Sequence, residues 1–515
     1  MKNKIKIGML LALTAQLQAN PISSHTFFSI RPEFQTGSPE RETLLRDPFI
    51  IDNDRRGVFE LVPIVGHSAN SNKLAEYFLP FGKSEILVAE DNSLYASQRD
   101  VSAAQLNINN STLTNPLGNT FASRSKFEFE RSVMGIGFGY RCRLFNHNGH
   151  GMWFAISSPF EIVRNNVTIH EHIIEPSGNP VGVGPLLTQD NFGQSDEEQI
   201  DPISVSSVTL AFMQQTWEFG RVDQCAHEKI GLADIDFQFG YAWHDVHCHA
   251  ELYLGATIPT GNKPKACLLF EPIIGNNKHG AILFGGTLLN KLFVRGDISI
   301  SMILSMNSRY LFANTQPRSF DLKDKRWGRY MEVYANIEAA EAAAAALSVN
   351  INAFGTPGIN VFTQNMRVHP GFSNLMNLGF VFKNSFFHGE LGYELFSRQA
   401  ERVKLACCWQ PGPALIAAVG SGETTKSRTI NHNASGSDDV LLPNYAVLEA
   451  SDLDIASAAH PSVVDHSLYV SGGFECNNEN TRVTPFLTIG ASYEFSSNNA
   501  SIDRWLAWLK YGLMY

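Results

Sequence analysis

The clearest pattern along the chain is a regular alternation of apolar and polar residues between Ala233 and Ile258. The apolar rows are Ile235, Phe237, Phe239, Tyr241 and Trp243, then Cys248, Ala250, Leu252, Leu254, Ala256 and Ile258. The polar rows are Asp234, Asp236, Gln238, Gly240 and His244, then His247, His249, Glu251, Tyr253, Gly255 and Thr257. Because side chains of a strand point alternately to opposite faces, this pattern predicts a β-hairpin with one apolar and one polar face.

Such a hairpin fits either a soluble sandwich with an apolar core or an outer-membrane barrel with an apolar outer face and a polar lumen. The same alternation recurs over residues 297–307, 376–395 and 482–495. Most of these runs extend over roughly ten residues, which is close to the ~9–11 residues that a tilted strand needs to cross a bilayer. The length and recurrence of the pattern therefore favour the barrel.

The N-terminal region predicts export from the cytoplasm. Residues 1–19 combine three lysines with a short apolar stretch, and cleavage is expected after residues 17–19. Such a stretch is typical of a signal peptide, since it is too short to span a membrane as a helix. Residues 20–56 are polar and contain four prolines, so we interpret them as a periplasmic lead-in to the barrel.

The C-terminal residues form one more alternating row that ends on an aromatic residue. Lys510, Gly512 and Tyr515 resemble the C-terminal assembly signal of Gram-negative outer-membrane proteins, which implies that the barrel-assembly machinery recognises the last strand. A helical stripe through Trp505, Leu509 and Leu513 is the alternative interpretation.

Composition limits the class of protein. The chain has 515 residues, a net charge of −10 and a mean hydropathy of −0.11. No stretch reaches the ~18 consecutive apolar residues of a membrane helix, and the acidic balance gives no basic surface for nucleic acid. The seven cysteines are an odd number without a C-x-x-C pair, which argues against a disulfide scaffold.

The complete pattern predicts an all-β fold, a transmembrane antiparallel β-barrel of roughly 12–16 strands that occupies residues 57–515. Further strands are expected at residues 57–65, 127–142, 152–164, 205–215, 282–293, 329–336 and 466–475. Loop or plug insertions are expected at residues 72–125, 337–358 and 410–465. Residues 72–78 and the alanine-rich residues 337–347 are expected to be helical and are the candidates for a plug in the lumen.

The polar rows supply the candidate functional residues. The expected lumen-lining side chains are Asp234, Asp236, Gln238, His247, His249, Glu251, His388, Glu390 and Glu394. Because acidic rings attract cations and repel anions, these rows predict a wet lumen that disfavours anions. The histidines near Glu251 could also hold Zn²⁺, although histidines that face water need no ligand, so neither a metal nor a cofactor is predicted. The chain lacks the G-x-S-x-G and H-E-x-x-H motifs, and we expect no enzyme activity.

One segment resembles a narrower family. The strand that opens at residues 231–234 and the strand that ends in Ile258-Pro259-Thr260-Gly261-Asn262 resemble a hairpin of outer-membrane channels associated with the meta-cleavage pathway of phenol degradation, which are similar to long-chain fatty acid transporters. The resemblance implies a barrel that passes hydrophobic molecules.

Together these features predict an outer-membrane channel or transporter for small molecules, hydrophobic ones among them, whose partners are outer-membrane lipid and its solute. The alternatives are a structural or adhesive surface barrel, or a barrel enzyme such as a phospholipase or a protease.

Overall fold

The fold was analysed in a computed structural model of the chain. The structure describes residues 22–42, 56–90, 93–108, 120–176, 205–323, 325–339, 355–417, 444–475 and 483–515. The predicted signal peptide and most of the expected helix at residues 337–347 lie outside these ranges.

Twelve antiparallel strands form a closed barrel. Around the ring the order is β1 (Gly57–Ser68), β4 (Ala122–His147), β5 (His150–Glu175), β7 (Ile235–His244), β8 (Cys248–Ile258), β9 (Ala281–Arg295), β10 (Ile298–Leu311), β16 (Gly371–Lys383), β17 (Phe387–Arg398), β22 (Val463–Glu475), β23 (Thr484–Ser496) and β24 (Arg504–Met514). The first strand closes the ring on the last, with registers from Val58↔Met514 to Ser68↔Arg504. The predicted barrel and strand range are confirmed, and residues 504–514 form a strand rather than a helix.

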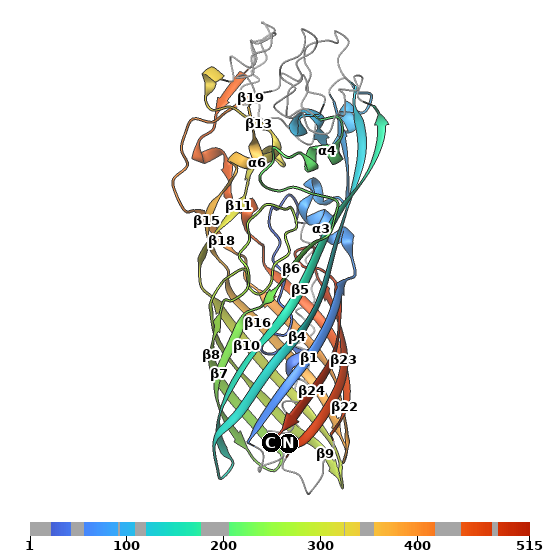
Figure 1. The fold of residues 1–515 in the computed structure, drawn as a ribbon, viewed down its shortest axis with the longest axis vertical. Coiled ribbons are helices and arrows are strands. Elements are labelled where there is room, and N and C mark those ends of the chain that lie inside the picture. The colour runs from blue at the N-terminus through green and yellow to red at the C-terminus, as the bar shows by residue number, and fades with distance from the viewer. Residues whose placement is uncertain are drawn as a thin grey trace, which may run out of the picture.

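The two ends of the barrel differ (Figure 1). Short turns join β4 to β5, β7 to β8, β9 to β10 and β16 to β17 at the end where the C terminus lies, which we call the turn end. Long connections follow β1, β5, β8, β10 and β17 at the opposite end, which we call the loop end. In outer-membrane barrels the short turns face the periplasm and the long loops face the outside.

The outer face of the ring is apolar. Along β8, Leu254 is 62% exposed whereas Glu251 is 6% exposed, so the apolar row points outward and the polar row points into the lumen. Equivalent outward residues recur around the ring and include Phe239, Tyr241, Ile300, Phe380, Leu391, Ile489 and Leu509. A closed ring pairs every strand edge and its outer face suits lipid, so the protein is a Gram-negative outer-membrane β-barrel.

Large aromatic side chains on the inner face lie flat against glycines of the neighbouring strand. The cross-strand pairs are Trp153↔Gly240, Tyr253↔Gly285, Tyr469↔Gly392, Trp508↔Gly490 and Phe486↔Gly512. A Cβ atom at any of these glycines would come within 2.1–2.4 Å of an atom of the aromatic side chain. Glycine is therefore needed at these positions, and the flattened rings leave room in the lumen.

Residues 22–42, which we call the plug, run from the loop end, where the backbone of residues 24–26 hydrogen-bonds Leu79, Tyr77 and Ser457, into the lumen and end in the short helix α1 (Pro39–Glu42). Ile22 hydrogen-bonds Asn499 at the loop end, whereas the carbonyl of Arg41 accepts a hydrogen bond from Lys510 of β24. Residues 22–42 of the expected periplasmic lead-in at residues 20–56 therefore contact the inside of the barrel, and residues 43–55 lie outside the described ranges. The physical reason is that the charged side chains of this segment find ion-pair partners on the lumen wall.

Elements from the long connections pack above the ring and form a cap. They include α3 (Ser71–Phe78), η3 (Pro80–Gly82), β2 (Glu85–Ala89), η4 (Ala96–Gln98), β3 (Val101–Ser102), η5 (Ala103–Leu106), α4 (Val208–Met213), β6 (His227–Leu232), β11 (Asn314–Ser319), β12 (Asp321–Leu322), η7 (Gly328–Tyr330), β13 (Glu332–Val333), β14 (Thr356–Pro357), α6 (Gly358–Val361), β15 (Thr363–His369), β18 (Arg402–Leu405), β19 (Ala414–Ala417), β20 (Asn444–Val447), η9 (Ala450–Asp452), β21 (Leu453–Asp454) and η10 (Ile455–Ala458). Their core is a buried aromatic cluster that contains Tyr77, Phe78, Phe127, Phe129, Phe212, Trp217, Phe270, Trp327 and Tyr330. No described helix is long and apolar enough to cross a membrane.

Two strand predictions in the cap were wrong, and one helix prediction was right. Residues 205–215 contain α4, whose first turn is capped by the Ser207 side chain, which accepts a hydrogen bond from the Leu210 backbone at 3.2 Å. Residues 329–336 contain only part of η7 and the two-residue strand β13. The expected helix at residues 72–78 corresponds to α3, but it lies in the cap rather than in the lumen.

Candidate functional site

The structure places eight of the nine candidate lumen residues on the inner face of the barrel. Asp234, Asp236, Gln238, His249, Glu251, His388, Glu390 and Glu394 are all buried. His247 is the exception, because it lies in the turn between β7 and β8 and is exposed. The alternation of the strands sets this inward orientation, and the plug covers much of the resulting surface.

One clamp holds the plug through Arg31. Its guanidinium bridges Glu394 of β17 and Glu494 of β23, with both N–O distances at 2.5 Å. Arg504 of β24 in turn pairs with Glu494 at 3.1 Å and with Glu33 of the plug at 2.6 Å. A guanidinium offers several donors in a fixed planar arrangement, so Arg31 can hold two carboxylates from different strands at once.

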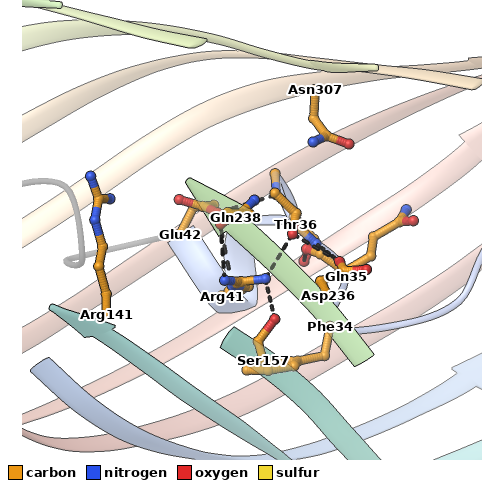
Figure 2. Close-up of polar contacts among 12 residues, drawn as sticks. Phe34, Gln35, Thr36, Arg41, Glu42, Arg141, Ser157, Asp236, Gln238 and Asn307 are labelled. Atoms are coloured by element: carbon orange, nitrogen blue, oxygen red, sulfur yellow. Dashed lines mark hydrogen bonds and ion pairs between the residues drawn. The ribbon is translucent and has the colours of Figure 1, made fainter. Parts of the chain in front are cut away.

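A second set of contacts centres on Asp236 of β7 (Figure 2). This carboxylate accepts hydrogen bonds from Thr36 of the plug at 2.8 Å and from Thr257 of β8 at 2.7 Å. It also pairs with Arg309 of β10 at 2.6 Å. Asp236 therefore joins the plug to three strands of the wall.

The third contact point is α1. Figure 2 shows the Arg41 side chain between Thr36, Ser157 and Gln238, and it donates hydrogen bonds to all three. Lys510 donates to the Arg41 carbonyl at 2.6 Å and is itself fully buried. The end of the plug is therefore fixed to β5, β7 and β24.

The remaining acidic candidates also have partners. Glu251 pairs with Arg141 of β4, and Glu390 accepts a hydrogen bond from Tyr469 at 2.6 Å. Asp234 accepts from the backbone N–H of Asn276 at 2.7 Å and from Gly261 at 3.3 Å, so it anchors the connection between β8 and β9. The carboxylates that predicted a cation-attracting lumen are thus engaged with arginines, a tyrosine and backbone amides.

The histidine candidates do not form a metal centre. His249 Nε2 lies 3.7 Å from Glu251, and His388 Nε2 lies 3.2 Å from the Thr488 hydroxyl. Among the residues that the structure describes, no three His, Cys, Asp or Glu side chains are arranged to hold a metal ion. His247 is exposed in the turn, whereas His249 is buried on β8, so the two imidazoles do not face the same space.

A cavity lies beside α1 in the half of the lumen nearer the turn end. Its volume is about 20 Å³, which is room for about one water molecule, and its walls come from the plug and from β1, β4, β5, β7, β8, β9 and β10. The lining combines charged side chains of both signs with apolar ones and with the aromatic side chains Trp153 and Tyr253.

The sequence-based reasoning missed the plug residues and their basic partners on the wall. Arg31 and Arg41 lie in a segment without hydrophobic periodicity, and only its alternation of charges hinted at buried pairing. Arg309, Arg504 and Lys510 occupy inward positions of strands whose other inner residues include apolar ones, so the inner row did not stand out as polar.

The sequence matches no known protein family, and no curated protein is detectably similar to it. Solved structures with partial similarity include an outer membrane channel and the transport unit of an autotransporter. An outer membrane channel from Pseudomonas putida F1 gives a TM-score of 0.37 at 8% identity, over 90% of this chain and 98% of the channel. The transport unit of the autotransporter AIDA-I from Escherichia coli gives 0.32 at 6% identity, over 93% and 95% of the two chains.

A Pseudomonas aeruginosa homologue of FadL gives a TM-score of 0.26 at 6% identity, over 89% of this chain and 90% of the homologue. At such low scores and identities these neighbours carry no function over to the present chain. Its assignment as an outer-membrane β-barrel therefore rests on its own closed strand ring and apolar outer face.

Proposed function

We propose that this protein is an outer-membrane channel or transporter for small polar molecules, which the plug closes in the conformation described here. The observation that carries the proposal is the chemistry of the contact between plug and wall. The plug is bound by ion pairs and hydrogen bonds through Arg31, Thr36 and Arg41. Displacing the plug would expose a polar passage, which would suit water and polar solutes better than hydrophobic ones.

The polar contacts also give the closed state a physical route to opening. Removing one partner of a buried hydrogen bond destabilises the folded protein while the other partner stays buried. Water can replace the missing partner as soon as the plug moves. An apolar contact between plug and wall would expose hydrophobic surface to water at each opening. A polar contact instead exchanges its hydrogen bonds for hydrogen bonds to water. The plug contacts therefore support gating rather than a permanently filled barrel.

Conductance in planar bilayers tests the proposal. A variant that lacks residues 22–42 should show large, stable ion conductance, whereas the wild type should be closed for most of the time. Lys83→Ala is the matched control, because it breaks an ion pair with Asp100 in the cap and leaves the plug intact. If the deletion variant assembles as a heat-modifiable barrel and both proteins stay electrically silent, the channel proposal is wrong.

A structural or adhesive surface barrel is the second candidate, and the cap favours it. Nine large aromatic residues bury one another above the ring, so the loops form a folded unit rather than separate connections. Two results together would support this alternative. The purified protein would bind to cells or matrix, and deletion of the plug would not change the conductance.

A further inference from the structure

Three strands of the cap form a small sheet with one apolar face and one positively charged face. In this antiparallel sheet β15 lies between β11 and β18. Met366 and Val368 of β15 are buried and pack into a core with Phe362. The opposite face presents Arg367, Arg402 and Lys404, which are exposed, and His369, which is half-buried. Because side chains alternate along a strand, these charges point away from the core of the cap. We call this surface the cationic face.

The charges of the cationic face lie beside one another without a counter-charge. Lys404 lies directly opposite Arg367 in the register of β15 and β18, and Arg402 lies directly opposite His369. Like charges in such cross-strand positions destabilise a sheet. Burial and the charges of Arg367, Lys404 and Arg402 lower the pKa of His369, so this imidazole is neutral at pH 7. The side chains of the three cations form no ion pair or hydrogen bond with the residues that the structure describes.

Acidic residues are absent from this sheet although the whole chain is acidic. The three strands contain no Asp or Glu, whereas the chain as a whole has a net charge of −10. Glu401, which precedes β18, is buried and lies 3.4 Å from Arg318. It also accepts a hydrogen bond from the His460 backbone at 3.0 Å. Glu401 is therefore engaged inside the cap, and the cationic face needs an anion from another molecule.

The cationic face lies directly above an aromatic part of the lipid-facing wall. Only Pro370 and Gly371 separate β15 from Phe372 of β16, and Phe312 lies two residues before β11. The exposed ring of Tyr310 lies 4.9 Å from the ring of Phe372 and 5.9 Å from that of Phe312. Aromatic side chains gather where lipid tails meet headgroups. Figure 1 shows β11, β15 and β18 above the ring at the loop end, which places their charges at the level of the headgroups of the outer leaflet.

We propose that the cationic face binds the phosphate groups of an acidic lipid in the outer leaflet of the membrane. A guanidinium can bind a phosphate through two parallel hydrogen bonds, and the Lys404 ammonium adds a third positive charge. The face continues the lipid-facing wall, so the tails of the same lipid would contact Tyr310, Phe312 and Phe372. A free phosphate ion would lack these apolar contacts. The inference goes beyond the proposed function, because it does not depend on movement of the plug.

Binding of lipid A to the full-length protein tests the inference. The probes are diphosphorylated lipid A and its dephosphorylated form, offered in a non-ionic detergent and followed by native mass spectrometry. We expect the diphosphorylated form to bind at least about tenfold more tightly. Added salt should weaken its binding, since the contact is electrostatic and partly exposed. Millimolar inorganic phosphate should not displace it, because the tails also contribute to binding.

A charge-neutral double variant tests the residues. Arg367→Gln with Lys404→Gln should weaken binding of diphosphorylated lipid A about thirtyfold, since each Lys or Arg near an anionic lipid surface changes the affinity about fivefold. Arg124→Gln with Lys126→Gln is the matched control, because it removes the same charge from the cap at two cations that pair with Glu85 and Glu128. This control should bind the lipid like the wild type.

Thermal unfolding separates a lipid site from a structural role. Without lipid, the Arg367/Lys404 variant should unfold at the same or a higher temperature than the wild type, because two repelling charges are gone. Diphosphorylated lipid A should raise the unfolding temperature of the wild type and of the control but not of this variant.

Four results would overturn the inference. They are equal binding of the two forms of lipid A, equal losses in the two double variants, displacement of the lipid by inorganic phosphate, and a marked loss of stability of the Arg367/Lys404 variant without lipid. The last result would show that the two cations have partners within the protein. None of these results concerns conductance, so the proposed function is tested separately.

Discussion

At the scale of single residues, the lumen is organised by buried charges that join parts of the chain far apart in sequence. Arg31 and Glu494 are 463 positions apart, yet they pair inside the barrel together with Glu394 and Arg504. Breaking a buried ion pair by removing one partner leaves an uncompensated charge, which costs more than the pair itself contributes. These residues therefore fix where the plug lies more than they add to the stability of the ring.

Replacing Arg31 tests this view. Arg31→Ala should lower the free energy of unfolding by about 3–5 kcal/mol, because Glu394 would lose its cation and Glu494 would keep only Arg504. Arg31→Lys should recover only part of the loss, since an ammonium cannot bridge two carboxylates as a guanidinium does. Denaturant titration in detergent measures both effects.

Lys73→Ala serves as the comparison, because the Lys73–Asp503 pair at 2.6 Å is partly exposed at the rim. Such a pair should contribute less than about 1 kcal/mol. Equal losses for Arg31→Ala and Lys73→Ala would show that the Arg31 clamp does not hold the plug.

At the scale of elements, the two faces of each strand have separate roles. Leu254→Arg should destabilise the barrel by ~2–4 kcal/mol if the residue lies near the middle of the bilayer. Leu94→Arg provides a matched control, because Leu94 is 86% exposed in the cap and not on a strand of the ring. Folding titrations into lipid vesicles give both values, and similar costs at the two sites would contradict the assignment of the outer face.

The cap carries buried histidines that make it sensitive to acid. Burial lowers the pKa of His279 to about 4 from its usual 6.5, and burial and Arg398 hold the pKa of His460 well below its usual value. Below pH 6.5 these histidines bind protons in the unfolded chain but stay neutral in the folded cap. The free energy of unfolding therefore falls as the pH drops from 6.5 towards about 4. Above pH 6.5 these groups add no pH dependence.

The expected loss is up to ~1.4 kcal/mol per pH unit for each such histidine. Fluorescence of the cap tryptophans Trp217 and Trp327 in guanidinium titrations at pH 7.5 and 5 would follow it. His279→Gln should show a smaller pH dependence, and an unchanged slope in this variant would exclude His279 as a source.

At the scale of the whole molecule, the alternation of apolar and polar residues predicted the strands of the barrel wall. It did not predict the plug that lies inside the wall. The hairpin at residues 233–258 was predictable because each side chain meets only lipid or lumen. Residues 22–42 have no such period, and their partners lie hundreds of positions away, so no local signal placed them inside the barrel. The apolar residues of 205–215 fit the period of a strand as well as that of a helix, and the Ser207 cap favours the helix.

The same distinction applies to the candidate site. The inward direction of Asp236, Glu251 and Glu394 followed from alternation, but their pairing with Arg309, Arg141 and Arg31 depends on tertiary packing. Unpaired carboxylates would make the lumen attract cations. The basic partners of these carboxylates could be identified only from the fold. Function at this scale depends on whether the plug moves.

A reversible lock on the plug tests that central claim most directly. The Phe34 ring lies over Gly137 of β4, where a Cβ would come within 2.5 Å of it, so Phe34→Cys with Gly137→Cys places one thiol on the plug and one on the wall that faces it. The native cysteines would be replaced by serine first. We predict that a cross-link between the two thiols abolishes glucose-driven swelling of liposomes that contain the protein and that reductant restores it, whereas equal swelling of the locked and reduced proteins would contradict the account.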